Sequence, residues 1–366
     1  MTAETAAPPE ISRLGEARIR RGNIILIACA LVSILGFVAA VVFGPLAISL
    51  GDLVAVFLKQ LGLTEANAVG AVKVGVIENL RVPRALLGFA VGAALGASGA
   101  TMQGFFRNPL ADPGLIGVSA GGALTAVGVI VLGAGFIDQL TGASRAFAMP
   151  MMAFMGALLT VFAIYRISLF DGRVIVATML LAGVAANALA YSGIGYLTFL
   201  ADDAQLRDLT FWTLGSLGGA TWERVIPAIV LMIIATFGLL TLTRAMNCLL
   251  LGEADANSLG VNVESVKRRA ALFTALGVGA ATAACGIVGF VGLVVPHLVR
   301  LMTGPDHRFV LPGSALLGAA LVLFSDLVAR LSVAPAELPL GVVTAALGAP
   351  FFFWLLVKDK RLESLG

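Results

Sequence analysis

The chain has 366 residues and a formal net charge of +3, and 59% of its residues are hydrophobic while only 12% are charged. A soluble globular domain has about 25% charged residues, so this composition excludes an ordinary water-soluble fold and indicates an integral membrane protein. The chain has only two histidines and three widely separated cysteines, which excludes a histidine-rich metal site and a disulfide framework. We therefore expect no metal site.

Apolar runs long enough to cross the hydrocarbon, which takes about 20 residues per helix, follow one another along the chain. The first run is too long for the apolar region of a cleavable signal peptide, so it is interpreted as a transmembrane helix. We predict a cytoplasmic tail (1–22), a transmembrane domain (23–358) and a second cytoplasmic tail (359–366). The predicted fold is all-α with about ten transmembrane helices, at 23–44, 85–106, 114–136, 146–166, 174–200, 225–245, 268–284, 286–303, 310–331 and 338–357.

Glycine spacing predicts that the second and third helices pack closely against their neighbours. Gly88, Gly92 and Gly96 recur every four residues on one face of the second helix, and Gly117 and Gly121 repeat the spacing in the third. Such faces let helix backbones approach each other in lipid, where packing drives association. The pattern indicates a compact bundle and assigns no chemistry.

Charge placement predicts the orientation of the chain in the membrane. With the N-terminus in the cytoplasm, about two thirds of the 24 lysines and arginines fall in cytoplasmic segments, as the positive-inside rule requires. An even number of spans then places both termini on the cytoplasmic side.

The loop after the second helix has the features of a tight cytoplasmic hairpin. Asp112 is suited to cap a helix, and the proline that follows it is suited to the first helical turn. We expect Arg107, Asn108 and Asp112 to hold this hairpin together.

The largest cytoplasmic insert runs from Leu251 to Arg269. It is long enough for one or two short amphipathic helices, broken at Gly252 and Gly260. A loop with its own helical pattern among short connections indicates a docking surface for a cytoplasmic partner; the alternative is an ordinary solvated loop.

Two arginines, Arg81 and Arg84, lie at the outer mouth of the second helix, and Arg330 ends the ninth. They either snorkel to the interface or form a cationic rim that receives carboxylates from an external partner. The outer segment Leu206–Trp222 combines two tryptophans with three glycines and is suited to flex as an outer gate.

The sequence provides no energy source of its own. No glycine is followed by lysine, so the chain has no phosphate-binding loop of the G-x-x-x-x-G-K-[ST] type, and no catalytic arrangement stands out. Asp326 is the main ionisable residue within a span. An intramembrane charge is a functional candidate by default, and the alternative is a packing residue bonded within the bundle.

Three long motifs resemble one family. They are RVPRALLGFAVGAALGASGATMQGFFRNPLADPGLIGVSAGG (81–122), GIVGFVGLVVPHLVRLMTGPDHRFVLPGSALLGA (286–319) and DLVARLSVAPAELPLGVVTAALGAPFFFWLL (326–356). The chain resembles, over about 46–358, the FecCD-type permease subunits of type II ABC importers for iron-siderophores, haem and vitamin B12.

The resemblance implies a homodimer in a bacterial inner membrane, with the substrate path at the dimer interface. It implies two cytoplasmic ATPase subunits that bind ATP and Mg²⁺, a periplasmic binding protein, and no cofactor on this chain. The matched residues would be Arg81, Arg84 and Arg330 for docking of the binding protein; Leu251, Gly252, Glu253, Ala256, Leu259 and Gly260 in a coupling loop (249–267); and Val176, Ala177 and Thr178 at a cytoplasmic gate. The gate sequence departs from the hydroxyl-rich run of the B12 permease.

The expected function is import of a bulky iron chelate. Haem is favoured because the GSLGGATW stretch resembles haem permeases, and a ferric siderophore or vitamin B12 is the alternative within the family. From other classes, the alternatives are an ion-coupled secondary carrier that uses Asp326 and a non-transporting structural or receptor subunit. Nucleic acid is not expected as a partner.

Overall fold

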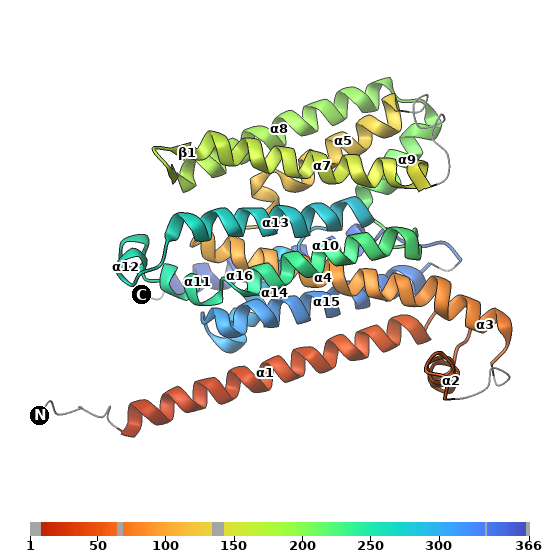
Figure 1. The fold of residues 1–366 in the computed structure, drawn as a ribbon, viewed down its shortest axis with the longest axis horizontal. Helices are drawn as coiled ribbons and strands as arrows, with labels where there is room; N and C mark the ends of the chain where they lie inside the picture. The colour runs from red at the N-terminus through yellow and green to blue at the C-terminus, as the bar shows by residue number, and fades with distance from the viewer. Residues whose placement is uncertain (1–8, 64–68, 134–142, 334, 364–366) are drawn as a thin grey trace, which may run out of the picture.

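The computed structural model describes residues 9–63, 69–133, 143–333 and 335–363. The long helices run side by side in a bundle (Figure 1). Ten helices correspond to the ten predicted spans and confirm the all-α membrane fold. They are α1 (Pro9–Val42), α4 (Val82–Phe105), α5 (Val118–Leu132), α7 (Ala143–Ser168), α8 (Val176–Leu200), α10 (Trp222–Leu240), α13 (Val263–Cys285), α14 (Val291–Thr303), α15 (His307–Leu331) and α16 (Leu340–Glu363).

Short elements lie at the two ends of the bundle. One end carries α2 (Leu50–Gln60), α3 (Ala71–Val76) and α9 (Asp203–Leu214). The other end carries the start of α1, the end of α16, strand β1 (Leu169–Phe170) and α12 (Glu253–Ser258) (Figure 1). The remaining elements are the π-helix Ile77–Arg81, the 3₁₀-helix Pro113–Ile116, α11 (Thr243–Leu249), α12 (Glu253–Ser258) and a two-stranded antiparallel sheet of β1 (Leu169–Phe170) and β2 (Arg173–Val174).

Within the described residues, six helical stretches are long and apolar enough to cross a membrane. α5, α14 and α16 are shorter apolar helices. α14 has 13 residues, a length of about 20 Å, so it is shorter than the roughly 30 Å of hydrocarbon.

The boundary between the seventh and eighth predicted spans is shifted in the structure. α13 begins at Val263 instead of residue 268, and α14 begins only at Val291 instead of residue 286. The chain leaves α13 at Gly286, which has a φ of +75°, a region that glycine adopts without a steric penalty. A Cβ at this position would overlap the carbonyl oxygen of Trp212, so α9 packs directly on the break.

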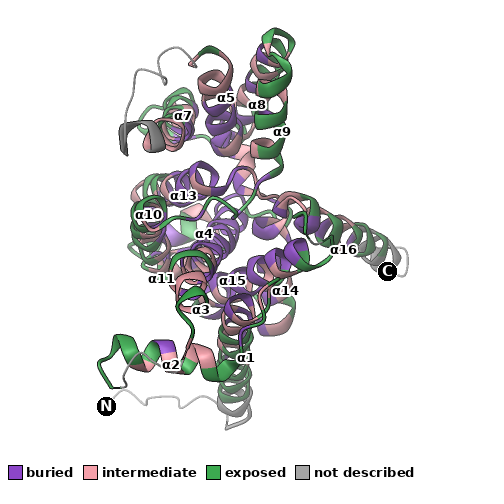
Figure 2. Ribbon diagram, turned by 90° about the vertical axis from the view of Figure 1, so that its right-hand side faces the viewer, coloured by how far each residue is buried: buried purple, intermediate pink, exposed green. Residues whose placement is uncertain are grey.

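The glycine face of α4 makes the close approaches that its spacing predicted. A Cβ on Gly92 would overlap the backbone of Gly318, and a Cβ on Gly96 would overlap the carbonyl of Ser314. Both neighbours belong to α15, and Gly121 makes the same kind of approach to α7. Close backbone packing therefore places α4 in the buried centre (Figure 2).

The helices at the two edges of the bundle are the least covered. α8 lies at one edge and α1 at the other (Figure 1). Only 17% of the most apolar window of α8 is buried, compared with 83% for the stretch that contains α4. A large part of the α8 surface is therefore available to lipid or to another chain.

Candidate functional site

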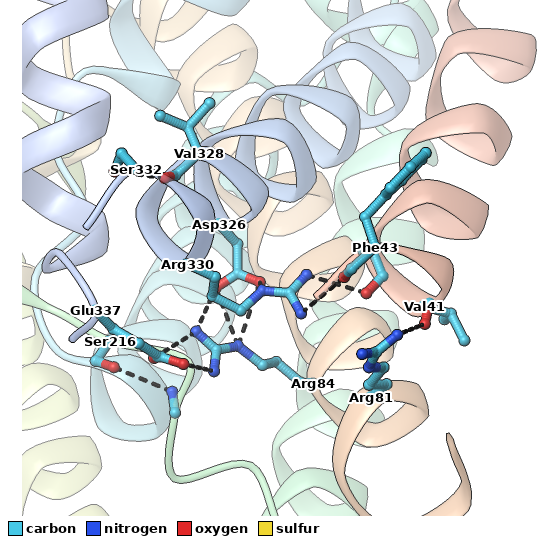
Figure 3. Close-up of polar contacts among 12 residues, drawn as sticks. Val41, Phe43, Arg81, Arg84, Ser216, Asp326, Val328, Arg330, Ser332 and Glu337 are labelled. Atoms are coloured by element: carbon cyan, nitrogen blue, oxygen red, sulfur yellow. Dashed lines mark hydrogen bonds and ion pairs between the residues drawn. The ribbon is translucent and has the colours of Figure 1, made fainter. Parts of the chain in front are cut away.

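At the end of the bundle that carries α2 and α9, Arg84 holds two carboxylates. Its guanidinium lies 2.8 Å from the Asp326 carboxylate of α15 and 2.9 Å from that of Glu337 (Figure 3). Asp326 also lies 3.1 Å from Arg330, one turn along α15. Asp326 is almost completely buried, whereas the Glu337 side chain is 43% exposed. The pair with Asp326 is therefore fixed within the bundle, and the one with Glu337 faces solvent.

The other two arginines predicted for docking donate hydrogen bonds to backbone carbonyl groups at the C-terminal end of α1. Arg81 donates to the carbonyls of Val41 and Val42, at 2.9 and 2.6 Å, and Arg330 donates to the carbonyl of Ala40 at 3.0 Å. The last carbonyls of a helix have no intrahelical donor, and cations are favourable beside them. Both arginine residues are at least 94% buried, so in the isolated chain they stabilise the contact between α1, α4 and α15.

The structure thus brings all three predicted docking arginines together, and we name Arg81, Arg84 and Arg330 with Asp326 and Glu337 the arginine cluster. Arg84 is the member with a solvent-facing ion pair, through Glu337. Asp326 lies five residues from the end of α15 and is held by two guanidinium groups, which fits the packing role. Docking of an external partner at this cluster stays a prediction.

The predicted outer segment Leu206–Trp222 is a helix followed by a loop with a turn at Gly218 and Gly219. The start of this loop is bonded on both sides: the Ser216 amide donates to the Cys285 carbonyl at 2.8 Å, and the Leu340 amide donates to the Gly215 carbonyl at 2.9 Å. α9 is therefore connected through backbone hydrogen bonds to the end of α13 and the start of α16.

At the opposite end, the predicted hairpin after α4 forms by local hydrogen bonds. The Asp112 carboxylate accepts from the Gly114 amide at 2.7 Å and caps the 3₁₀-helix, which confirms its predicted capping role. The Asn108 side chain accepts from the Leu110 amide at 2.9 Å. Arg107 is exposed and lies 4.0 Å from Glu253, so this hairpin reaches the insert that contains α12.

The insert forms the short helix that the sequence predicted. α12 runs from Glu253 to Ser258 between Gly252 and Gly260, and both glycines have positive φ. Ala256 is fully buried against the bundle, while Leu251 and Leu259 are 65% and 62% exposed. Two exposed leucines on either side of a short helix form an apolar surface suited to docking.

A buried lysine that the sequence analysis did not single out connects α12 to the neighbouring elements at this end of the bundle. The Lys267 ammonium lies 2.8 Å from Glu253 of α12, 3.2 Å from Glu264 and 3.1 Å from the Val174 carbonyl of β2. Glu264 in turn accepts from the Val174 amide at 2.8 Å. We name Lys267, Glu253, Glu264 and Val174 the lysine cluster. It joins α12, α13 and β2 through charge-assisted hydrogen bonds, the stronger kind.

The predicted gate residues begin the helix that follows this cluster directly. Val176, Ala177 and Thr178 form the first turn of α8, two residues after Val174. The strands before them turn at Asp171-Gly172, where both residues have positive φ. An Asp-Gly pair between short apolar runs is a strong hairpin signal, so the hairpin was readable from the sequence, whereas the buried state of Lys267 was not.

Comparison with known proteins identifies relatives over most of the chain. The model of the FecCD transport family matches residues 31–358. The chain is 45% identical to the hemin transport system permease protein HmuU of Yersinia pestis, over 78% of this chain and 84% of the relative. It is 41% identical to the cobalamin import system permease protein BtuC of Halobacterium salinarum, over 84% and 78%. A solved inward-facing metal-chelate type ABC transporter aligns with a TM-score of 0.78 and 28% identity, over 92% of this chain and 99% of that one.

Proposed function

Because this chain belongs to the FecCD transport family, the membrane permeases of ABC importers, we propose that it carries haem or a similar iron chelate into the cytoplasm. The 45% identity to a hemin permease supports haem as the substrate. Cobalamin is the second candidate, on the 41% identity to a cobalamin permease.

The proposed orientation places the end with both termini and α12 in the cytoplasm. The excess of lysine and arginine in the segments at this end supports it. Two ATPase subunits would then bind at α12, one for each copy of the permease, and a periplasmic binding protein would bind at the end that carries α9. ATP and Mg²⁺ would be held by the ATPase subunits.

The observation that carries the proposed coupling is the lysine cluster. A displacement of α12 acts on Glu253, and Lys267 passes it to the Val174 backbone, two residues before the first turn of α8. We therefore assign Lys267 the role of joining the ATPase contact to the predicted gate at Val176, Ala177 and Thr178.

A second copy of the chain is proposed to cover α8. This helix is the least buried of the candidate spans, and its exposed side chains include Leu181, Leu189 and Tyr196. A path between two copies would be lined by such side chains and would suit a bulky, mostly apolar chelate.

The arginine cluster offers one contact to a binding protein. Glu337 is exposed and shares Arg84 with the buried Asp326. A carboxylate of the binding protein would take the place of Glu337 on Arg84, while Asp326 keeps the guanidinium oriented. Arg81 and Arg330 would then support this contact by holding α1 in place.

The proposal is tested by transport in proteoliposomes that contain this chain and its ATPase subunits. Uptake of haem, cobalamin and a ferric siderophore would be measured with the binding protein outside and ATP inside. We expect haem uptake that requires ATP and the binding protein. Faster uptake of cobalamin would refute the substrate, and uptake by the chain alone would refute the ATP-driven mechanism.

A further inference from the structure

A cavity of about 430 Å³ opens between α7 and α10, near the end of the bundle that carries α9. Its lining is mostly apolar and includes aromatic and methionine side chains from α7 and α9, which are Phe147, Met149, Met151, Phe154, Phe211 and Trp212. The floor is formed by α13, against which both α7 and α10 pack. The cavity lies outside the arginine cluster and the lysine cluster.

The floor is open because α13 presents only small side chains there. Ala280, Ala283 and Ala284 line the cavity, so no long side chain from α13 fills the space between the two neighbouring helices. Along α10 the lining extends from Arg224 to Leu231, a rise of about 10 Å. The cavity therefore has the depth of about one third of the roughly 30 Å hydrocarbon layer.

The helices beside the cavity present an apolar surface of the kind that faces lipid. On α7, Met151 and Leu159 are 54% and 59% exposed, and on α10, Ile226 and Ile234 are 54% and 50% exposed. The opening between α7 and α10 is thus continuous with a surface that suits hydrocarbon.

One cation and one anion line the same cavity. Arg224 lies in the first turns of α10 and Asp208 lies on α9, and both are exposed. Neither makes an ion pair with another side chain in the part of the chain that the structure describes. The nearby Trp212 is of the residue type that is enriched at the membrane interface.

We propose that this cavity binds a zwitterionic phospholipid from the leaflet on the α9 side. An acyl chain occupies the apolar floor over Ala280, Ala283 and Ala284. The phosphate accepts from the Arg224 guanidinium, and the ammonium of the headgroup lies beside the Asp208 carboxylate. A headgroup with both charges matches this pair, whereas a purely anionic headgroup meets repulsion from Asp208. This lipid site does not depend on which substrate the importer carries.

The test uses the intact permease–ATPase complex in nanodiscs that contain equal amounts of phosphatidylethanolamine and phosphatidylglycerol. Trace amounts of either lipid carry a photoreactive group in the acyl chain, and labelled peptides are mapped by mass spectrometry. We expect phosphatidylethanolamine to label Phe147–Phe154 and Pro227–Leu231 above the level on the exposed face of α1, which reports bulk lipid.

Variants separate the contributions of the two charges. Arg224→Gln lowers labelling at the cavity about two- to fivefold, the range for one exposed charge contact, and Asp208→Asn removes the preference for phosphatidylethanolamine. The control variant is Arg207→Gln. Arg207 lies next to Asp208 on α9 but outside the cavity lining, so this change is expected to leave labelling unchanged. All three residues are exposed, so we expect each variant to fold, and size-exclusion profiles check this.

Three outcomes would overturn the proposal. The first is labelling of the cavity segments at the level of the α1 face. The second is labelling that does not change in Arg224→Gln. The third is loss of labelling when the binding protein is added, together with weaker docking of that protein to Arg224→Gln, which would assign the cavity to the binding protein.

Discussion

Replacement of Lys267 by methionine removes the charge that joins α12 to β2 and keeps an apolar side chain of similar length. Glu253 is 40% exposed, so water replaces much of what its ion pair with Lys267 contributes. The Val174 carbonyl belongs to a buried residue and loses its charged donor. An unsatisfied buried acceptor costs about 1–3 kcal/mol, and we use this range to set the expected decrease in substrate uptake.

That loss predicts separation of ATP hydrolysis from transport. A free-energy change of about 1.4 kcal/mol corresponds to a factor of ten, so we expect substrate uptake by Lys267→Met to fall roughly tenfold. ATP hydrolysis by the assembled complex is expected to persist, because α12 itself and its exposed leucines are unchanged. Both rates are measured on the same proteoliposomes with the ATPase subunits and the binding protein.

The matched control is Arg268→Met, which changes the adjacent exposed residue of α13. This variant is expected to transport and hydrolyse ATP like the unchanged protein. Unchanged uptake in Lys267→Met would refute the role of the lysine cluster in coupling. Loss of ATPase subunits from the purified complex would show instead that the cluster only maintains the docking surface.

Three further changes test the packing and the charge clusters. Gly96→Val places a branched side chain against the Ser314 carbonyl, so we expect a loss of several kcal/mol and little monodisperse protein on size exclusion. Asp326→Asn leaves Arg84 and Arg330 without their buried carboxylate, so we expect about 3–5 kcal/mol lower stability in thermal unfolding and weaker docking of the binding protein at Arg84. ATP-driven uptake per folded protein is expected to be retained when the binding protein is saturating, and abolished uptake by fully folded protein under that condition would contradict this. At Asp306, burial raises the pKa, but hydrogen bonds from Arg308 and Asn247 lower it to about 2. The ionised carboxylate therefore contributes stability of about 1 kcal/mol after allowance for solvent screening, which is present above pH 4 and is lost as the pH falls toward 2. Thermal unfolding should therefore show the difference from Asp306→Asn at pH 7 disappearing near pH 2, and a constant difference would be inconsistent with this pKa.

The helical bundle was predictable because each span carries its own signal. Spanning helices must satisfy their backbone polar groups internally, so length and hydropathy locate them one at a time. The glycine spacing of α4 likewise predicted close packing, although not that α15 is the partner. A break between α13 and α14 was correctly predicted, but α14 begins five residues later than predicted, because the chain leaves α13 at Gly286, where α9 packs against it.

The polar clusters were only partly predictable, because they join residues that are distant in sequence. The three arginines were recognised as outer cations, yet their partners come from α1 and from Glu337, 253 residues after Arg84. Lys267 looked like one of three consecutive cations in a loop, and only the fold buries it beside Val174 while Arg268 and Arg269 stay exposed.

The sequence by itself determined the membrane class, the number of spans, the short helix of the insert that follows Leu251 and the family of this protein, because these depend on local composition and on motifs that are continuous along the chain. Only the tertiary structure decided which charges are paired, which helix connects α12 to α8, and where a cavity remains between helices. Those features depend on distances between segments, which hydropathy and spacing along one chain do not specify.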